Sequence, residues 1–600
     1  MTQDKNYMME KSESGAKKFW RIVFGTMVGF FLSGIVLFIL SFFFMIAIVS
    51  SFKPSVPVTQ SNSILKITLP DQISERNTST PFDNMDWFVS YTGLNEILEC
   101  IENASTDPQI KGIYLDVSHV MAAPATVQEI RDALAEFKNS GKFIYAYNES
   151  FSQNGYYLSS VADKVVLNSQ GSLEFKGIAS QTLFYKGLLE KLNLDIQVVR
   201  HGQFKSAVEP FLMDKMSEAN REQTSLYVNT IWNTMLENIS ESRNISTDSL
   251  QMIASGLLCE NAQKAFELGL VDQIGYYQDV ESELKQRAGI ETSSSLNMIS
   301  LSDYHKTVNT STGYGKDKIA VIYATGDIVD GKGREDEIGS ESFCQTLRKA
   351  YKNDRVKAIV LRVNSPGGSA MASEVIWNEI EMAKKAGKIV VTSMGDYAAS
   401  GGYYIACNSD AIIAQPSTLT GSIGVFGMIP NLQNMLKTKL GVTIDVVKTN
   451  PHADYFSGLR KLDEMEIGKI QVMIEDTYAT FTKRVADGRH MDIGKVDEIG
   501  QGRVWAGADA LNIGLVDQLG TIQDAIGLAA KMANLDQYGI EYYPKQQDWF
   551  TKVFGNTSEE NIRSAIKAEM GELYYTYSAL KTIMNVSGVQ ARMPMEIMID

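Results

Sequence analysis

The sequence repeats itself, and this repeat constrains the fold more than any other feature. Short segments of the first half have counterparts in the second half, in the same order along the chain. The matching segments are IKGIYLDV (110–117) with VKAIVLRV (356–363), NGYYLSSVADKVVLN (154–168) with GGYYIACNSDAIIAQ (401–415), LNLDIQVVR (192–200) with LGVTIDVVK (440–448), and GLVDQIG (269–275) with GLVDQLG (514–520). The second of these pairs aligns without gaps at an offset of 247 residues. We therefore predict two tandem copies of one domain, at about 55–295 and 315–540, joined by a Ser/Thr-rich linker at 296–314.

Each copy has the pattern of alternating strands and helices. KAIVLRV (357–363) is a short β-branched run typical of a buried parallel strand, and ASEVIWNEIEMAKKAG (372–387) has apolar residues at helical spacing. KIVVTSM (388–394), AIIAQ (411–415) and IDVVK (444–448) are predicted as further strands. This order predicts an α/β fold in which a parallel sheet is flanked by helices.

A second constraint is the apolar segment at 22–49, which has 28 residues and no charge. It is longer than the roughly 20 residues that cross a bilayer, and no A-x-A-like cleavage site follows it. We predict an uncleaved transmembrane anchor. Basic residues precede this segment, and only Lys53 closely follows it. The positive-inside rule then predicts that residues 1–21 are cytoplasmic and that everything after about residue 50 is exported.

The composition excludes several other classes of function. A net charge of −15 argues against a nucleic-acid partner. The four cysteines are scattered without metal-ligand spacing, and there is no P-loop and no HExxH motif. No metal, nucleotide or other cofactor is therefore expected.

The two copies differ where catalysis would require particular residues. The second copy has NSPGGS (364–369) after its first strand, whereas the first copy has SHVMAA (118–123). Glycines there leave backbone N–H groups open, as an oxyanion hole requires. Ser400 begins a helix in DYAASGGYYIA, and Gln153 stands at the corresponding place in the first copy. Taken separately, these features could be a tight turn and a helix N-cap; together they favour a nucleophile beside an oxyanion hole.

A serine nucleophile needs a base, and none of the five histidines lies in a glycine-framed motif. Lysine can serve when burial keeps it neutral. Lys205 follows a predicted strand in HGQFKSAVEPF (201–211), whereas the corresponding segment of the second copy (446–456) has Ala453 or a neighbour at that place. The first copy thus has the lysine without the serine, and the second has the serine without the lysine. This reciprocal loss indicates one site assembled from both copies.

Five motifs together resemble the long, two-domain form of the signal peptide peptidase A family, the S49 serine peptidases. They are KSAVEPF, RVNSPGGS, ASGGYYIA, SIGVFG and GRVWAGADALNIGLVDQLG. The resemblance covers nearly the whole chain, including the anchor. It implies tandem crotonase/ClpP-like domains behind one N-terminal transmembrane helix, and a membrane-anchored serine endopeptidase. It also implies a homotetramer in the inner (cytoplasmic) membrane, with periplasmic catalytic domains that degrade signal peptides and other apolar peptides.

The resemblance also implies residue roles. Lys205 and Ser400 are expected to form a Ser-Lys dyad, and Gly367, Gly368 and Gly401 are the candidates for the oxyanion hole. The repeat does not explain the C-terminal tail at 541–600.

Two other functions compete with the peptidase. One is a crotonase-like enzyme that holds an acyl-CoA thioester enolate with the same two N–H groups. The other is a membrane-tethered oligomeric scaffold that kept the fold after losing its chemistry, as the first copy has lost its serine and glycines.

Overall fold

The computed structural model describes residues 15–51, 57–70, 73–77, 92–308, 315–545, 589–593 and 598–599. Contacts divide the chain into two units, Met1–Pro57 and Val58–Asp600. Lys11 and Lys53, which contribute to the expected orientation in the membrane, lie outside the described residues, as does most of the tail at 541–600.

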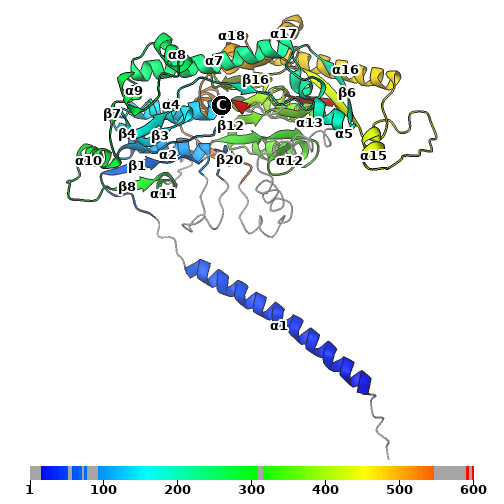
Figure 1. The fold of residues 1–600 in the computed structure, drawn as a ribbon, viewed down its shortest axis with the longest axis horizontal. Coiled ribbons are helices and arrows are strands. Elements are labelled where there is room, and N and C mark those ends of the chain that lie inside the picture. The colour runs from blue at the N-terminus through cyan, green and yellow to red at the C-terminus, as the bar shows by residue number, and fades with distance from the viewer. Residues whose placement is uncertain are drawn as a thin grey trace, which may run out of the picture. The chain divides into compact units, whose positions relative to one another are not determined.

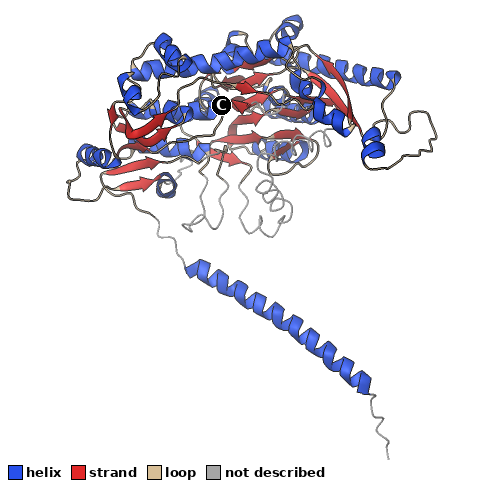
Figure 2. Ribbon diagram, viewed as in Figure 1, coloured by secondary structure: helices blue, strands red, loops and turns tan. Residues whose placement is uncertain are grey.

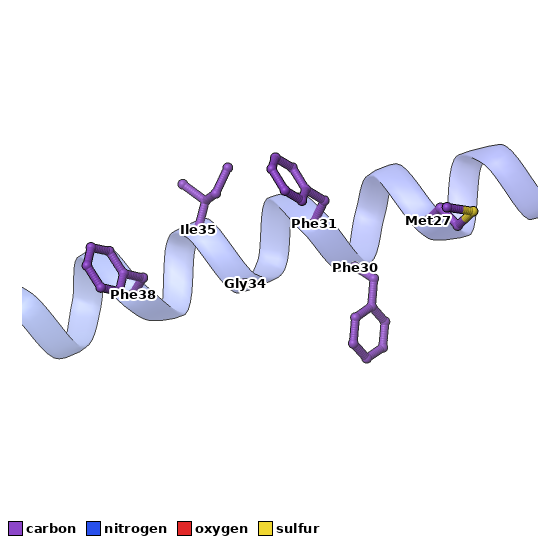
Figure 3. A pocket seen from close by; sticks show the side chains of 6 residues that line it. All are labelled: Met27, Phe30, Phe31, Gly34, Ile35 and Phe38. Carbon is purple, nitrogen blue, oxygen red and sulfur yellow. The ribbon is translucent and has the colours of Figure 1, made fainter. Parts of the chain in front are cut away.

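The N-terminal unit contains one long helix, α1 (Gly15–Ser51). Its stretch Phe19–Phe43 has 25 residues and a mean hydropathy of 2.5, which is long and apolar enough to cross a membrane. Figure 3 shows side chains of this helix pointing outward around its axis, where they border a shallow apolar hollow. No polar side chain lines that hollow, so it is the surface of an apolar helix rather than a reaction site.

The C-terminal unit begins with the first copy, whose sheet has the strand order β7-β4-β3-β2-β1-β8, with every neighbouring pair parallel. The strands of this copy are β1 (Ser63–Ile67), β2 (Ile110–Leu115), β3 (Phe143–Phe151), β4 (Lys164–Leu173), β5 (Ser180–Gln181), β6 (Asp195–His201), β7 (Gln273–Ile274) and β8 (Met298–Ser300). Its helices are α2 (Leu94–Thr106), α3 (Pro124–Lys138), α4 (Gln153–Ser159), α5 (Lys186–Leu192), η1 (Ser206–Val208), α6 (Glu209–Leu212), α7 (Glu218–Arg243), α8 (Thr247–Ser255), α9 (Ala262–Glu267), α10 (Tyr277–Ala288) and α11 (Leu301–Thr307).

The second copy has an eight-stranded sheet around the path β18-β16-β14-β12-β9-β20, from which β15 and β19 branch at β14. The strands are β9 (Lys318–Thr325), β10 (Asp327–Val329), β11 (Glu337–Gly339), β12 (Val356–Ser365), β13 (Gly367–Ser369), β14 (Ile389–Ala399), β15 (Ala411–Ala414), β16 (Leu419–Gly421), β17 (Val425–Asn431), β18 (Val504–Ala506), β19 (Gln518–Leu519) and β20 (Gly539–Tyr543). The helices are α12 (Ser340–Tyr351), α13 (Ala370–Lys385), α14 (Gly401–Ala406), α15 (Gln433–Lys439), α16 (Glu464–Arg489), α17 (Ile493–Ile499), α18 (Gly507–Asn512) and α19 (Ile522–Met532). Helices flank the strands of both copies (Figure 2).

The repeat in the sequence is a repeat in the structure. Helices α7 and α16 have 26 residues each, and each ends at a residue with left-handed backbone, Asn244 or His490. In the first copy the Tyr156 hydroxyl donates to the Leu270 carbonyl at 2.8 Å. In the second copy the Tyr403 hydroxyl donates to the Leu515 carbonyl at 2.9 Å. The predicted tandem α/β fold, in which parallel strands are flanked by helices, is therefore confirmed. Within the described residues, the one antiparallel pair in these two sheets is β16 with β18 at the edge of the second.

A third sheet joins the two copies, with the order β11-β10-β13-β21-β17-β6. Strand β6 of the first copy runs antiparallel to β17 of the second copy, from the pair Asp195–Asn431 to the pair His201–Val425. The remaining strand, β21 (Val589–Arg592), comes from the C-terminal tail. Another tail strand, β22 (Met598–Ile599), pairs with β5 of the first copy.

The prediction of a strand at IDVVK (444–448) is wrong, because these residues have no regular structure. The matching segment of the first copy forms β6, which pairs with β17. Residues 444–448 have no such partner strand within the described residues, and the Val447 side chain is fully exposed. The range 296–314 contains β8 and α11, while residues 309–314 lie outside the described part. The proposed domain boundaries stay a prediction.

Candidate active site

Ser400 lies in a sharp turn between β14 and α14. Its backbone has φ 55° and ψ −113°, a conformation that costs a serine about 1–3 kcal/mol and that the surroundings must stabilise. The Ser400 N–H donates to the Gly421 carbonyl at 2.8 Å, and the Ser400 carbonyl accepts from the Tyr404 N–H at 2.8 Å. These two bonds hold the turn, and the Ser400 side chain is fully buried.

Lys205 lies in the turn between β6 and η1, on the first copy. Two glycines of the second copy leave room for it. A Cβ atom on Gly502 would stand 2.7 Å from the Lys205 backbone, and one on Gly424 would stand 3.2 Å from Lys205 Cδ. The pairing of β6 with β17 places this turn of the first copy against the second copy.

Lys205 and Ser400 are therefore brought together from positions 195 residues apart. Lys205 Nζ lies 2.8 Å from Ser400 Oγ, and both residues are fully buried. The same Nζ lies 3.0 Å from the hydroxyl oxygen of Ser422 and 3.1 Å from its carbonyl oxygen.

Burial lowers the pKa of Lys205 well below the usual value of 10.5. Among the ion pairs of the described residues, none includes Lys205, so no carboxylate offsets the cost of burying the charge. A neutral amine has two N–H donors and one lone pair. The two oxygens of Ser422 can accept the two N–H bonds, which leaves the lone pair to accept the Ser400 O–H. The three contacts of Nζ thus suit a neutral lysine next to a serine hydroxyl.

Ser422 was not predicted as a site residue. It lies in the motif SIGVFG, directly after β16, and has a positive φ of 49°. The motif was a signal for the family, but the sequence gives no reason to expect the Ser422 side chain beside Lys205.

Two of the three glycines expected to form the oxyanion hole, Gly367 and Gly401, lie against each other beside Ser400. Gly367 and Gly368 form the start of β13, and Gly367 has a φ of 104° that disfavours any other residue. A Cβ atom on Gly367 would stand 2.7 Å from the backbone nitrogen of Gly401. The Gly367 N–H already donates to Ser365 Oγ at 3.2 Å. Gly368 and Gly401 are therefore the better pair of donors for an oxyanion.

In the first copy, Gln153 occupies the position that corresponds to Ser400, and its side chain is hydrogen-bonded to the backbone. Gln153 Oε1 accepts from the backbone N–H groups of Lys176 and Gly177, both at 3.0 Å. Its Nε2 donates to the Gly177 carbonyl at 3.1 Å. Gln153 thus holds a loop where Ser400 faces Lys205.

One cluster of possible metal ligands lies elsewhere, and it is already neutralised. His452, Asp463 and Glu466 have ligand atoms within 4.8 Å of one another. However, Arg460 donates to both carboxylate oxygens of Glu466, at 2.6 and 2.7 Å. The Arg460 guanidinium lowers the pKa of Glu466 to about 2. Because this cation occupies the carboxylate, the cluster does not suit a metal ion.

Comparison with known proteins identifies relatives along most of the chain. Residues 136–291 and 382–536 match the family model "Peptidase family S49", and residues 313–440 match the model "Clp protease". "Protease 4" of Salmonella typhi is 42% identical over 75% of this chain and 74% of its own. "Protease 4" of Haemophilus influenzae is 37% identical over 76% of this chain and 75% of its own. "Serine protease SPPA, chloroplastic" of Arabidopsis thaliana is 31% identical over 89% of this chain and 78% of its own.

Proposed function

Since the chain belongs to peptidase family S49, we propose that its serine peptidase activity is carried by Ser400 as the nucleophile and Lys205 as the general base. The observation that carries this proposal is the 2.8 Å contact between Lys205 Nζ and Ser400 Oγ in a fully buried place. A desolvated lysine is the neutral base that a serine hydroxyl requires.

The reaction follows from these groups. Neutral Lys205 takes the proton of Ser400, and Ser400 Oγ attacks the carbonyl carbon of a peptide bond. Lys205 then gives the proton to the amine that leaves, and an acyl-enzyme remains on Ser400. A water molecule, activated by the same lysine, hydrolyses the ester and restores both side chains. Ser422 positions the amine by accepting its N–H groups.

The negative charge of the tetrahedral intermediate needs donors that are in place before the reaction. We assign this role to the backbone N–H groups of Gly368 and Gly401, with Gly367 keeping the turn open. The strained turn at Ser400 supports this arrangement because it exposes the following N–H next to the nucleophile.

The substrates on this proposal are signal peptides and other apolar peptides at the surface of a membrane. The apolar stretch of α1 supports a tether in the lipid bilayer. The basic residues Lys17, Lys18 and Arg21 before this stretch support an N-terminus in the cytoplasm, with the peptidase domains exported. We place the protein in the inner (cytoplasmic) membrane as a homotetramer. The exposed segment 444–448, which lacks the strand partner that β6 has, is a surface available for such an assembly.

The test is hydrolysis of a fluorogenic apolar peptide by the detergent-solubilised wild type, Ser400→Ala and Lys205→Ala, with the folding and the oligomeric state of each checked by light scattering. We expect both variants to keep their assembly and lose activity. We also expect a fluorophosphonate probe to label the wild type but not Ser400→Ala. An active Lys205→Ala beside an inactive Ser400→Ala would assign the base to another residue. A wild type that neither cleaves peptides nor reacts with the probe would favour a scaffold.

A further inference from the structure

Strand β14, which leads to Ser400, has a bulge shortly before the nucleophile. In its pairing with β12, residues 395–397 of β14 stand where β12 has only Asn364, between the ladder pairs Val363–Met394 and Ser365–Ala398. A bulge bends the strand that carries it, and bulges next to active sites often direct a side chain. The direction in which β14 delivers Ser400 therefore depends on how residues 395–397 are held.

The side chain of Asn364 holds the bulge from within the second copy. Its Oδ1 accepts from the Tyr397 N–H at 3.1 Å, and its Nδ2 donates to the Asp396 carboxylate at 3.2 Å. The next residue along β12 is Ser365, whose hydroxyl oxygen accepts from the Gly367 N–H. Asn364 thus connects the strand that leads to the nucleophile with the strand that leads to the glycines of the proposed oxyanion hole.

The first copy holds the same bulge through the start of α3. The two carboxylate oxygens of Asp396 accept from the N–H of Thr126 at 2.8 Å and from its hydroxyl at 2.9 Å. The N-cap residue of α3 is Ala123, which has no side-chain acceptor for these N–H groups. Asp396 supplies the missing cap from the other copy, at the end of a helix where an anion is favoured. Figure 1 shows the blue and cyan strands of the first copy beside the green strands of the second, and α3 packs against β14.

A buried ion pair of both copies restrains the bulge from another side. Glu75 of the first copy accepts from Asn364 Nδ2 and from Arg362 Nε, both at 2.9 Å. Glu129 of α3 pairs with the same guanidinium at 2.7 Å, and all three charged residues are buried. A Cβ atom on Gly395 would stand 2.7 Å from Glu75 Oε1, so the glycine makes room for this carboxylate. Buried ion pairs offset their desolvation only when their geometry is good, so these contacts resist a shift of the bulge.

We propose that Thr126 of the first copy is a positioning residue for the reaction: by holding Asp396 it fixes the bulge of β14, and thereby the approach of Ser400 to the peptide carbonyl. The inference rests on the proposed roles of Ser400 and Lys205. Thr126 acts through Asp396 rather than on the reacting atoms. The first copy then contributes to the site twice, through the base and through the strand that carries the nucleophile. A displacement of about 1 Å at a reacting group can lower a rate by about 100-fold, so one hydrogen bond at the bulge is expected to affect kcat.

The experiment measures kcat and KM for a fluorogenic apolar peptide, and the rate of labelling by a fluorophosphonate probe. Five detergent-solubilised full-length proteins are compared: the wild type, Thr126→Val, Thr126→Ser, Thr230→Val and Ser400→Ala. Thr230 of α7 also donates its hydroxyl to an aspartate of the second copy, Asp509 at 2.9 Å. Because Asp509 lies in α18 and not in the bulge, Thr230→Val is a matched control for Thr126→Val. Urea unfolding gives the stability of each protein, and the kinetics are measured where all of them are folded.

We expect Thr126→Val to lower kcat and the labelling rate by about 10-fold and to change KM by less than about twofold. Thr126→Ser keeps the hydroxyl and should regain most of the wild-type kcat. Thr230→Val should lose similar stability and keep the wild-type kcat.

Two results would overturn the inference and leave the proposed function standing, provided that Ser400→Ala is inactive. One is a Thr126→Val protein with the same kcat and labelling rate as Thr230→Val. The other is a Thr126→Ser protein as slow as Thr126→Val, because the hydroxyl would then not be the cause. A Ser400→Ala protein as active as the wild type would instead count against the proposed function, and the inference would fail with it.

Discussion

The two copies have the same scaffold but different residues at one place. In both, a buried tyrosine of a short helix donates to a carbonyl about 110 residues further on, through Tyr156 to Leu270 and Tyr403 to Leu515. A long helix in each copy ends in an arginine paired with an aspartate, Arg243 with Asp272 and Arg489 with Asp517. The place occupied by Ser400 in the second copy holds Gln153 in the first.

This difference shows that the contacts that hold the fold and those that carry the chemistry are separate. Gln153 bonds to the backbone of Lys176 and Gly177, whereas Ser400 bonds to a lysine of the other copy. On the proposed roles, the first copy supplies the base and the second copy the nucleophile, so each copy needs to keep only one of the two residues.

The strongest test of the comparison changes the same position in each copy. Ser400→Ala should lower kcat/KM by about 10,000-fold or more, since the nucleophile is lost. Gln153→Ala should leave kcat/KM unchanged and lower the free energy of unfolding by about 1–3 kcal/mol, because two backbone N–H groups lose their acceptor. Steady-state kinetics and urea unfolding measure the two effects. A large loss of activity in Gln153→Ala would show that the first copy has a catalytic role beyond Lys205.

The next test concerns the lysine, and Lys205→Met keeps the length of the side chain without its amine. We expect kcat/KM to fall by about 1,000-fold or more, since the general base is lost. The wild type should gain activity as the pH rises through the lowered pKa of Lys205. A variant that keeps the activity and the pH profile of the wild type would exclude Lys205 as the base.

The same variant should also change how stability depends on pH. Folded Lys205 is neutral above its lowered pKa, whereas the unfolded lysine stays protonated up to about 10.5, so unfolding takes up a proton in this window. The free energy of unfolding of the wild type should therefore rise with pH across it. Lys205→Met lacks this titration. Its stability advantage should be largest toward neutral pH and shrink as the pH approaches 10.5.

A smaller effect is expected at Ser422, which contacts the proposed base Lys205 rather than supplying the nucleophile or the base itself. Ser422→Ala should lower kcat by roughly 10- to 100-fold, because Nζ loses the hydroxyl that orients it. The hydroxyl oxygen also favours the charged amine, so its removal should move the acid limb of the pH profile to lower pH. A fall in activity without any shift of that limb would indicate that Ser422 only supports the fold.

The smallest effect should be the same in both copies. Tyr156→Phe and Tyr403→Phe each remove one buried hydrogen bond to a carbonyl, and each should lower the free energy of unfolding by about 1–2 kcal/mol. Neither should change KM. Urea unfolding of the two single variants measures the loss, and a much larger cost in one copy would show that the two scaffolds are not energetically equivalent.

Local patterns in the sequence predicted the strands that are buried on both faces, such as β12 and β14. A short run of β-branched residues is typical of a buried parallel strand. The reciprocal loss of serine and lysine also indicated that Lys205 and Ser400 belong to one site. The third sheet could not be predicted in this way. Its strands come from three distant parts of the chain, and β13 has only three residues.

The missed site residue Ser422 and the wrong strand prediction at IDVVK (444–448) have the same physical cause. A strand forms only where another strand pairs with it, and the role of a hydroxyl depends on the side chains around it. Both depend on residues distant in the sequence, which a short segment does not reveal. The segment at 444–448 has the composition of a strand, yet it pairs with no strand of the described residues. Ser422 resembles any serine in a tight turn until the fold places it beside the amine of Lys205.

The pairing of β6 with β17 also determines when the enzyme can become active. During synthesis the chain emerges from its N-terminus, so Lys205 is made long before Ser400 and before β17, the strand that pairs with β6. A partly made chain has either a lysine without a serine or no completed sheet to hold the two together. If Lys205 and Ser400 have the proposed roles, proteolytic activity begins only after the second copy has folded against the first. The order of the residues along the chain then protects the emerging polypeptide from its own active site.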